Sequence, residues 1–291
     1  MGTIVDDIVV VRGGWRRRRS ALRLADAAAK ACLRRAGRDP HDVDLLVNAG
    51  IYRDRNLGEP ALAAMIQDDI GANPEEPHSG GHGTFSFDVA NGTCGVMTAL
   101  QVVSGFLKSH TVDSAVIVTS DADPGGGSTD RFPFSPVGAA MSCTWSDGRD
   151  GLGQVHWLHR PDNAATLSAT VGYFARHNVL RIHESAALDE RFADAAADIA
   201  RRCLREESLD ISDVGMVIAA PARRAYRTAL AERLGIPERA VVVADDENTH
   251  TASLAAAFAK GAEQLAGGGC VLLVAAAAGI TAAAALYRKP V

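Results

Sequence analysis

The stretch FSFDVANGTCGVMTALQVVSGFLKSHTVDSAVIVTSD, residues 85–121, decides the fold class that we expect for this chain. It begins with the short apolar run Phe85–Ala90, passes through the small-residue turn Asn91–Thr93 and enters Gly95–Ser109, where apolar residues recur at helical spacing. A second apolar run, Ser114–Thr119, follows. The order strand, turn, helix, strand predicts layered α/β structure.

Cys94 lies between this turn and the helix, where the helix begins. The unpaired N–H groups and the dipole of a helix N-terminus stabilise a thiolate, and the same N–H groups can hold an oxyanion when a carbonyl is attacked. Gly92 and Gly95 remove side chains and permit a strained, exposed turn. Cys94 is therefore a candidate nucleophile. The alternative is a small buried residue, as most free cysteines are. The cysteines that lack this setting are Cys32, Cys143, Cys203 and Cys270.

The rest of the chain runs through helix and strand patterns in the same order twice. The expected helices are Ser20–Ala36, Pro60–Ile70, Asp189–Glu207, Pro221–Leu234 and Ser253–Leu265. The expected strands are Val43–Val47, Gly215–Ala220, Ala240–Val243, Cys270–Ala276 and Ile280–Tyr287, with Gly138–Trp145 and Gln154–Leu158 as a further pair. The repeated order predicts an internal duplication rather than two unrelated domains.

The composition favours a globular protein of the cytoplasm. The chain has 291 residues with 47% hydrophobic content, enough for one large core or two smaller ones. The net charge of −5 gives no indication of nucleic-acid binding. The cysteines form no CxxC pair, so neither a metal site nor a disulfide framework is expected, which fits a reducing compartment. No stretch resembles a signal peptide or is long enough to span a membrane, so we expect no membrane partner.

Three segments together resemble the ketoacyl synthase III group of the thiolase superfamily. Residues 85–121 are similar to its nucleophile segment, Glu247–Phe258 (ENTHTASLAAAF) to its asparagine-containing helix start, and Val271–Leu286 (VLLVAAAAGITAAAAL) to its closing strand, Gly-rich turn and strand. The resemblance implies a thiolase fold. This is an α/β architecture of two pseudo-symmetric halves, here residues 1–158 and 159–291, packed as αβαβα layers with mixed five-stranded sheets.

The resemblance also implies roles for individual residues. Cys94 would take the acyl group from acyl-CoA or from an acyl carrier protein, with no cofactor besides these substrates. Its N–H, together with one from the turn at Ala278 and Gly279, would form the oxyanion hole. Asn248 would bind the thioester carbonyl of the second substrate, and its context also permits the N-cap of a helix.

The family's histidine is missing from its expected place. It normally follows the strand that corresponds to Met216–Ala219, and by spacing to the next helix Ala220 takes its position. Because alanine neither hydrogen-bonds a carbonyl nor moves a proton, the usual Cys-His-Asn condensation does not follow from the resemblance. His250, two residues after Asn248, is one candidate replacement, and a surface or core histidine is the alternative.

Glu59 is the second candidate replacement. The segment YRDRNLGEP, residues 52–60, resembles a segment of the long-chain acyl-CoA head-to-head condensing enzymes, in which a glutamate reaches into the partner's site and acts as base. The alternative is a carboxylate that simply favours the first turn of a helix. The role of Glu59 requires a dimer, and the resemblance implies a dimer formed through the strand near residues 114–119.

Basic residues are candidates for contacts with the acyl donor. Arg223 and Arg224 begin a helix near the expected tunnel mouth, where the family receives the acidic carrier protein or the phosphates of CoA. The run Trp15–Arg19 (WRRRR) is either a source of phosphate contacts or a solvated basic run. Asn163–Ala187 is expected to contribute to the acyl pocket.

These features predict an acyltransferase or condensing enzyme of the ketoacyl synthase III type. Cys94 is acylated, and a second substrate positioned by Asn248 then receives the acyl group. The expected assembly is a homodimer. Because the histidine is absent, a non-condensing partner subunit of a heterodimeric synthase is the alternative, and a cysteine hydrolase is a third hypothesis.

Overall fold

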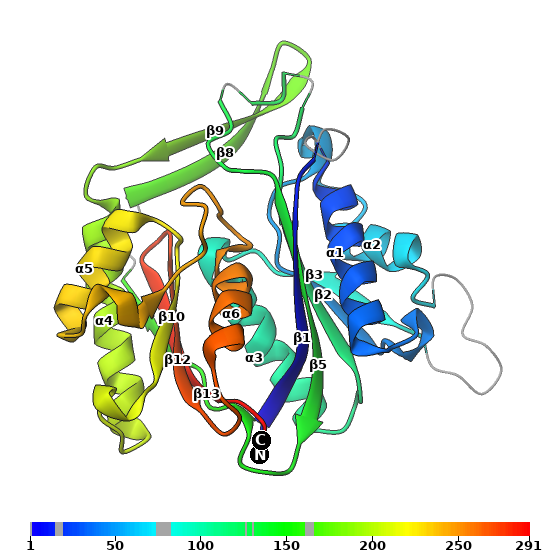
Figure 1. The fold of residues 1–291 in the computed structure, drawn as a ribbon. Coiled ribbons are helices and arrows are strands. Elements are labelled where there is room, and N and C mark those ends of the chain that lie inside the picture. Colours follow the sequence, from blue (N-terminus) through cyan, green and yellow to red (C-terminus); the bar gives the residue numbers. More distant parts are fainter. Residues whose placement is uncertain (1, 15–19, 74–82, 126, 130, 161–165) are drawn as a thin grey trace.

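The computed structural model describes residues 2–14, 20–73, 83–125, 127–129, 131–160 and 166–291. The basic run Trp15–Arg19 lies outside the described residues. The described elements form two halves that repeat one strand arrangement, and the two chain ends lie close together at one end of the molecule (Figure 1).

The first half carries a mixed five-stranded arrangement. Its elements are β1 (Gly2–Arg12), α1 (Ala21–Ala36), β2 (Leu45–Asn48), α2 (Leu62–Ile70), β3 (Phe85–Asp88), α3 (Gly95–Lys108), β4 (Ala115–Asp121) and β5 (Val137–Ser146). The strands lie in the order β3-β2-β4-β5-β1. β2 runs parallel to β3 and to β4, whereas β5 runs antiparallel to β4 and to β1.

The second half repeats this arrangement. Its elements are β6 (Gly151–Leu152), β7 (His156–His159), β8 (Leu167–Phe174), β9 (His177–Glu184), α4 (Leu188–Glu206), β10 (Met216–Ala220), α5 (Arg224–Leu234), β11 (Val241–Val242), α6 (Ser253–Gln264), β12 (Cys270–Ala277) and β13 (Thr281–Arg288). The order β11-β10-β12-β13-β7 has the same parallel and antiparallel pairs as the first half. β6 joins β1 to β13, so the two arrangements are continuous. The expected division at residue 158 falls inside β7.

The helices occupy three layers. α3 and α6 lie in the middle, α1 and α2 cover the outer side of the first half, and α4 and α5 cover the outer side of the second (Figure 1). A large buried cluster around Leu100, Phe258 and Leu273 fills the middle layer. Two further clusters lie beneath the outer helices. The expected αβαβα layering is therefore confirmed.

The helix ends follow local chemistry that the sequence displays. Ser20 caps α1 by accepting the N–H of Arg23. Glycines with left-handed backbone follow three helices, at Gly37, Gly71 and Gly235, with φ of 66°, 80° and 69°. The expected ends of these helices are confirmed to the residue.

One expectation about strands is wrong, and one strand was missed. β4 is hydrogen-bonded to β2 and to β5, and all of its residues are buried, so the strand near residues 114–119 has no free edge for a dimer contact. The expected strands Gly138–Trp145 and Gln154–Leu158 are confirmed as β5 and β7, of which β5 lies between β1 and β4 while β7 pairs with β13. The strand β1 was not expected at all.

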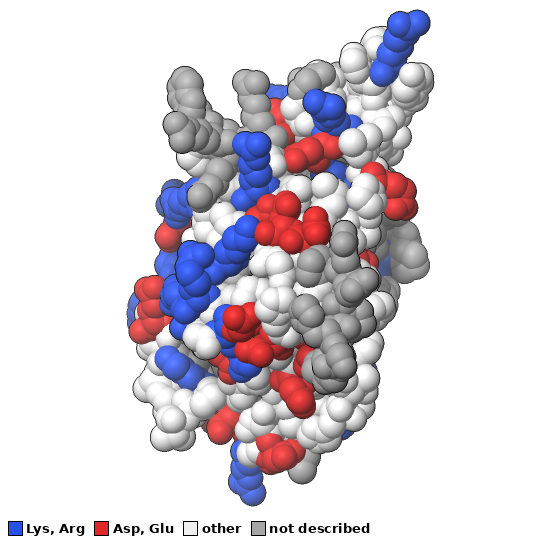
Figure 2. Space-filling model, turned by 90° about the vertical axis from the view of Figure 1, so that its right-hand side faces the viewer, with Lys and Arg blue, Asp and Glu red and all other residues white. Residues whose placement is uncertain are grey.

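The outer surface of α1 and α2 carries charges of both signs. Figure 2 shows basic and acidic side chains next to each other on this face. None of the helices among the described residues combines the length and apolar character that a membrane crossing requires.

Candidate active site

The turn Gly92–Cys94 fits tightly between the two halves. Gly92 has a φ of 50°, and a Cβ at Gly95 would come within 2.9 Å of the carbonyl oxygen of Ala49, so both glycines are required at their places. The Thr93 hydroxyl donates to the carbonyl of Ala276, at the end of β12. The nucleophile turn of the first half is thereby attached to the second half.

The Cys94 thiol faces the closing turn of the second half. Its Sγ lies 3.5 Å from the carbonyl oxygen of Thr281, the first residue of β13. The turn at Ala278 and Gly279, which connects β12 to β13, therefore adjoins the thiol, and Gly279 has a φ of 74°. The Cys94 N–H donates to the carbonyl of Asn91 at 2.9 Å, so in this conformation it is engaged locally.

Cys94 is fully buried. Burial raises the pKa of its thiol, which outweighs the stabilisation that a helix N-terminus gives to a thiolate. The resting residue is therefore a neutral thiol.

His250 lies beside the nucleophile turn. An added Cβ at Gly92 would lie 3.9 Å from both Cε1 and Nε2 of the His250 ring. The ring stacks on Phe134, with centroids 4.3 Å apart and an interplanar angle of 12°. Its Nδ1 is 2.9 Å from the hydroxyl of Tyr52. Burial lowers the pKa of His250 to about 3, and the positive charge of Arg223 adds to this effect, so the imidazole is neutral at physiological pH.

Asp121 holds the loop that carries His250. Its carboxylate accepts the backbone N–H groups of His250, Thr251 and Ala252, at 2.9, 2.9 and 3.3 Å, and the hydroxyl of Thr251 at 2.6 Å. Asp121 ends β4, so the first half fixes a loop of the second half. Burial raises the pKa of Asp121 to about 6 although the four hydrogen bonds oppose the shift, and the group is ionised at neutral pH.

A cavity of about 110 Å³ opens next to these residues. Its lining is Thr93, Pro133, Phe134, Leu167, Glu184, Leu188, Phe192, Pro221, Arg223, Glu247, Asn248, Thr249 and His250. Leu167 and Glu184 come from β8 and β9, within the segment that we expected to contribute to the pocket. The cavity is smaller than the about 300–1,000 Å³ of typical ligand pockets, and Cys94 is not part of its lining, so an acyl donor requires the cavity to widen.

Asn248 lines this cavity and is exposed. Its N–H donates to the Asp246 carboxylate, and its carbonyl accepts the N–H of Ser135. The helix α6 begins at Ser253 with Ala252 at the N-cap, so the alternative interpretation of Asn248 as a helix cap is wrong.

Arg223 and Arg224, which we expected to contact the acyl donor, differ in their surroundings. Arg223 forms ion pairs with Glu184 at 2.8 Å and with Asp189 at 2.7 Å, and these carboxylates raise its pKa against the effect of burial. Its charge is therefore already balanced at the cavity wall. Arg224 is exposed, and its backbone N–H donates to Glu247.

Glu59 is exposed and is not part of the cavity lining. Its neighbours in the sequence motif have structural partners. Arg53 pairs with Asp88, whose carboxylate accepts the first N–H groups of α2, and Asp54 accepts the hydroxyl of Ser20 and the N–H of Ala21 at the start of α1. Structural contacts within one chain thus account for Arg53 and Asp54, whereas they do not account for Glu59.

The family-model comparison matches residues 204–289 to the C-terminal region of 3-oxoacyl-[acyl-carrier-protein (ACP)] synthase III. Beta-ketoacyl-[acyl-carrier-protein] synthase III of Sodalis glossinidius is 29% identical over 266 residues, which cover 85% of this chain and 78% of the relative. A Streptomyces coelicolor synthase III is 27% identical over 248 residues, covering 83% and 70%.

Two solved structures share the architecture. The 3-oxoacyl-(acyl carrier protein) synthase III FabH of Pseudomonas aeruginosa has a TM-score of 0.84 at 22% identity, covering 100% of this chain and 99% of that chain. OleA of Xanthomonas campestris, solved with bound lauric acid and lauroyl-CoA, has a TM-score of 0.82 at 14% identity, with 99% coverage of both. The expected thiolase fold is confirmed. The chain is similar to the ketoacyl synthase III proteins over most of its length.

This ketoacyl synthase III-like chain departs from the expected family pattern at Ala220, which ends β10 and is fully buried. Tyr52, Asp121 and Tyr226 are site residues that sequence reasoning missed. The Tyr226 phenol is fully buried, has no hydrogen-bond partner among the described residues, and has its pKa raised by burial and by the nearby Cys94. Within the described residues, no group of three or more His, Cys, Asp or Glu side chains is placed to hold a metal ion.

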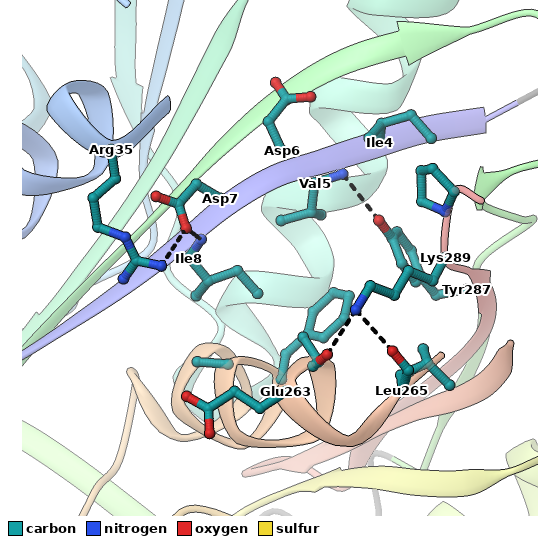
Figure 3. Close-up of a pocket in the computed structure, with 14 residues that line it drawn as sticks. Ile4, Val5, Asp6, Asp7, Ile8, Arg35, Glu263, Leu265, Tyr287 and Lys289 are labelled. Atoms are coloured by element: carbon teal, nitrogen blue, oxygen red, sulfur yellow. Dashed lines mark hydrogen bonds and ion pairs between the residues drawn. The ribbon is translucent and has the colours of Figure 1, made fainter. Parts of the chain in front are cut away.

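A separate groove of about 520 Å³ lies between β1 and the C-terminal part of α6 (Figure 3). Its polar groups are largely used within the chain. The Lys289 ammonium donates to the carbonyls of Ala262 and Leu265, and the Tyr287 hydroxyl accepts the N–H of Val5. None of the predicted site residues lines this groove.

Proposed function

We propose that the protein is a condensing acyltransferase in which Cys94 carries the acyl group. The observation that supports this most directly is the position of the thiol: it lies at the start of α3, 3.5 Å from the carbonyl oxygen of Thr281 and next to the Gly279 turn. The family relationship supports acyl-CoA or an acyl carrier protein as donor, because the relatives are named for the carrier protein and OleA was solved with an acyl-CoA.

The first step is a thioester exchange. The sulfur of Cys94 forms a bond to the acyl carbon, the bond between that carbon and the donor sulfur breaks, and the thiol proton passes to the departing thiol. In the second step a nucleophile positioned at Asn248 forms a bond to the acyl carbon as the bond to Cys94 breaks, and the proton that the nucleophile gives up passes to the sulfur. Neither step consumes an oxidant, and we propose that neither requires a bound cofactor.

His250 serves this chemistry as a hydrogen-bond donor rather than as a base. Its lowered pKa makes proton uptake unfavourable at neutral pH, but a neutral imidazole still carries one N–H. A donor beside the nucleophile turn would stabilise the negative charge that develops on the thioester oxygen. This role partly replaces the hydrogen bond that the family's histidine makes from the position of Ala220.

The test is the intact mass of the protein after incubation with short- to long-chain acyl-CoA and with acyl carrier protein donors. We expect an acyl adduct in the wild type and none in Cys94→Ala. Cys203→Ala is the matched control, because Cys203 is equally buried but lies on the buried face of α4. Absence of any adduct with every donor would overturn the proposal and favour the alternative, a partner subunit whose heterodimeric synthase is active elsewhere.

We further propose a homodimer formed through β3. Among the described strands it pairs only with β2 and ends the strand order, and its Phe85 is 56% exposed. An open apolar edge of this kind favours pairing with a second chain. The exposed Glu59 would then be available to the partner's site.

Mixing two inactive variants tests this arrangement. If Glu59 acts across the dimer, Cys94→Ala and Glu59→Gln chains that exchange subunits form one intact site per mixed dimer, and product formation returns to about half of the wild-type rate for that species. A monomer by light scattering, or no recovery on mixing, contradicts the proposal. The cytoplasmic location stays a prediction.

A further inference from the structure

Three aromatic rings, those of Tyr52, Phe132 and Phe134, form one cluster with the imidazole of His250. Tyr52 follows β2, Phe132 and Phe134 lie in the loop between β4 and β5, and His250 precedes α6. Tyr52 packs edge-on against Phe132, with centroids 4.9 Å apart, and its ring centroid is 5.6 Å from that of His250. Tyr52 is 4% exposed and His250 is 8% exposed. The cluster thus excludes water from the bond between the phenol and the imidazole.

The direction of the 2.9 Å hydrogen bond between Tyr52 and Nδ1 decides where the imidazole proton lies. A neutral imidazole has one N–H, and a phenol has one O–H. If the phenol donates to Nδ1, the buried O–H has an acceptor, and the single N–H of the neutral imidazole lies on Nε2. In the opposite arrangement Nδ1–H donates to the phenol oxygen, and the buried O–H loses this partner, which costs about 1–3 kcal/mol.

The remaining nitrogen faces the reacting centre. The Cε1–Nε2 edge of His250 lies against Gly92, whose added Cβ would be 3.9 Å from each of these two atoms and 3.6 Å from the Cβ of Ala277. Stacking on Phe134 fixes the plane of the imidazole ring. The hydrogen bond from the backbone N–H of His250 to the Asp121 carboxylate fixes the backbone from which the ring extends. The ring therefore has one orientation, and only the position of its proton is left to be set.

We propose that Tyr52 is a positioning residue that fixes His250 as the Nε2–H tautomer, so that Nε2–H donates to the carbonyl oxygen of a thioester at Cys94. The proposal rests on the function proposed above. It assigns the task of the family's missing histidine to a pair of residues from two other loops, one from each half. Asn248 then positions the second substrate, and His250 stabilises the charge.

The first experiment reads the tautomer directly. Nitrogen NMR of the protein labelled in its histidines distinguishes Nε2–H from Nδ1–H by the chemical shifts of the two ring nitrogens. The His250 signals are assigned by their loss in His250→Gln. We expect the Nε2–H form in the wild type, and an Nδ1–H or cationic ring would overturn the proposal. This measurement needs neither activity nor a variant of Tyr52, so it remains decisive if acylation is never observed.

The second experiment removes only the hydroxyl. Tyr52→Phe keeps the ring contacts, and we expect a mixture of tautomers together with an acylation rate about tenfold lower, with little change in the donor concentration at half saturation. Tyr287→Phe is the matched control, because its buried phenol is hydrogen-bonded in the distant groove of Figure 3. It should leave both the tautomer and the rate unchanged. An unchanged tautomer in Tyr52→Phe would refute the role of Tyr52, whereas lack of any Cys94 adduct in the wild type would refute the proposed function alone.

Discussion

The central helices of the two halves are attached to the opposite half by different chemistry. In the first half, the hydroxyl of Thr93, before α3, donates to the carbonyl of Ala276 near the end of β12. In the second half a buried carboxylate makes the attachment: Asp121, at the end of β4, accepts three backbone N–H groups and a hydroxyl from the loop before α6. The duplication kept the geometry and changed the strength of the attachment.

The difference between these two attachments matches the difference between the functional side chains at the starts of α3 and α6. The first half presents a small thiol that is already held by the turn around it, with Gly92 and Gly95 in close contact with their surroundings. The second half presents the imidazole of His250, which has to face the thiol with a defined edge. A charged acceptor for several N–H groups fixes a loop more firmly than one neutral hydrogen bond does.

The largest effect is expected when the stronger attachment is weakened. Asp121→Asn removes the charge and turns an amide N–H₂ towards backbone N–H donors, so we expect the free energy of unfolding to fall by about 3 kcal/mol. Denaturant unfolding measures this change. Asp123→Asn is the matched control, because within the described residues the Asp123 carboxylate accepts a single N–H, that of Gly125 in the following loop. Equal effects of the two substitutions would show that Asp121 is not the main attachment.

A smaller effect is expected at the equivalent point of the first half. Thr93→Val has nearly the same shape but loses the hydrogen bond to Ala276, and we expect a loss of about 1 kcal/mol. Thr93→Ser keeps the hydroxyl and serves as the control in the same unfolding measurement. A loss in Thr93→Val as large as that in Asp121→Asn would contradict the comparison between the halves.

Periodicity and helix caps predicted most of the helices and the layering, because apolar spacing and left-handed glycines are local signals. The strand β1 was missed because Asp6 and Asp7 interrupt its apolar run. The structure accommodates them by a register shift between Val5 and Asp7 in the pairing with β5. The pairings of β5 with β1 and of β7 with β13 join segments far apart in the sequence, and no local pattern indicates them.

The site was predictable only where the family resemblance reached. It brought Cys94 and the Gly279 turn together, and in the structure the Cys94 thiol lies 3.5 Å from the carbonyl oxygen of Thr281, two residues after Gly279. Asp121 stood at the end of the segment that decided the fold, and a carboxylate that ends a buried strand is a signal that could have marked it. Tyr52 has no such signal, because its role depends on a loop almost two hundred residues away, the 198-residue separation of its bond to His250.

The outer helices offer a second comparison between the halves. In the second half, opposite charges connect α4 to α5, since Arg233 pairs with Glu190 and Asp194. In the first half, two carboxyl groups connect α1 to α2, since Asp26 hydrogen-bonds Asp69. Burial, together with this carboxyl neighbour, raises the pKa of Asp26 to about 8. Ion pairs thus connect α4 to α5, whereas a hydrogen bond between two carboxyl groups connects α1 to α2.

This contrast predicts a modest pH dependence of stability that originates in the first half. Because the pKa of Asp26 is higher in the folded than in the unfolded chain, its contribution is complete below about pH 4 and is lost as the pH rises to about 8. Partial exposure of Asp26 limits the size, so we expect Tm to fall by a few degrees over this range. Asp26→Asn keeps a neutral donor to Asp69 and should flatten the profile. If the profiles of Asp26→Asn and the wild type coincide, the proton is not shared between α1 and α2, and both outer layers rely on charge alone.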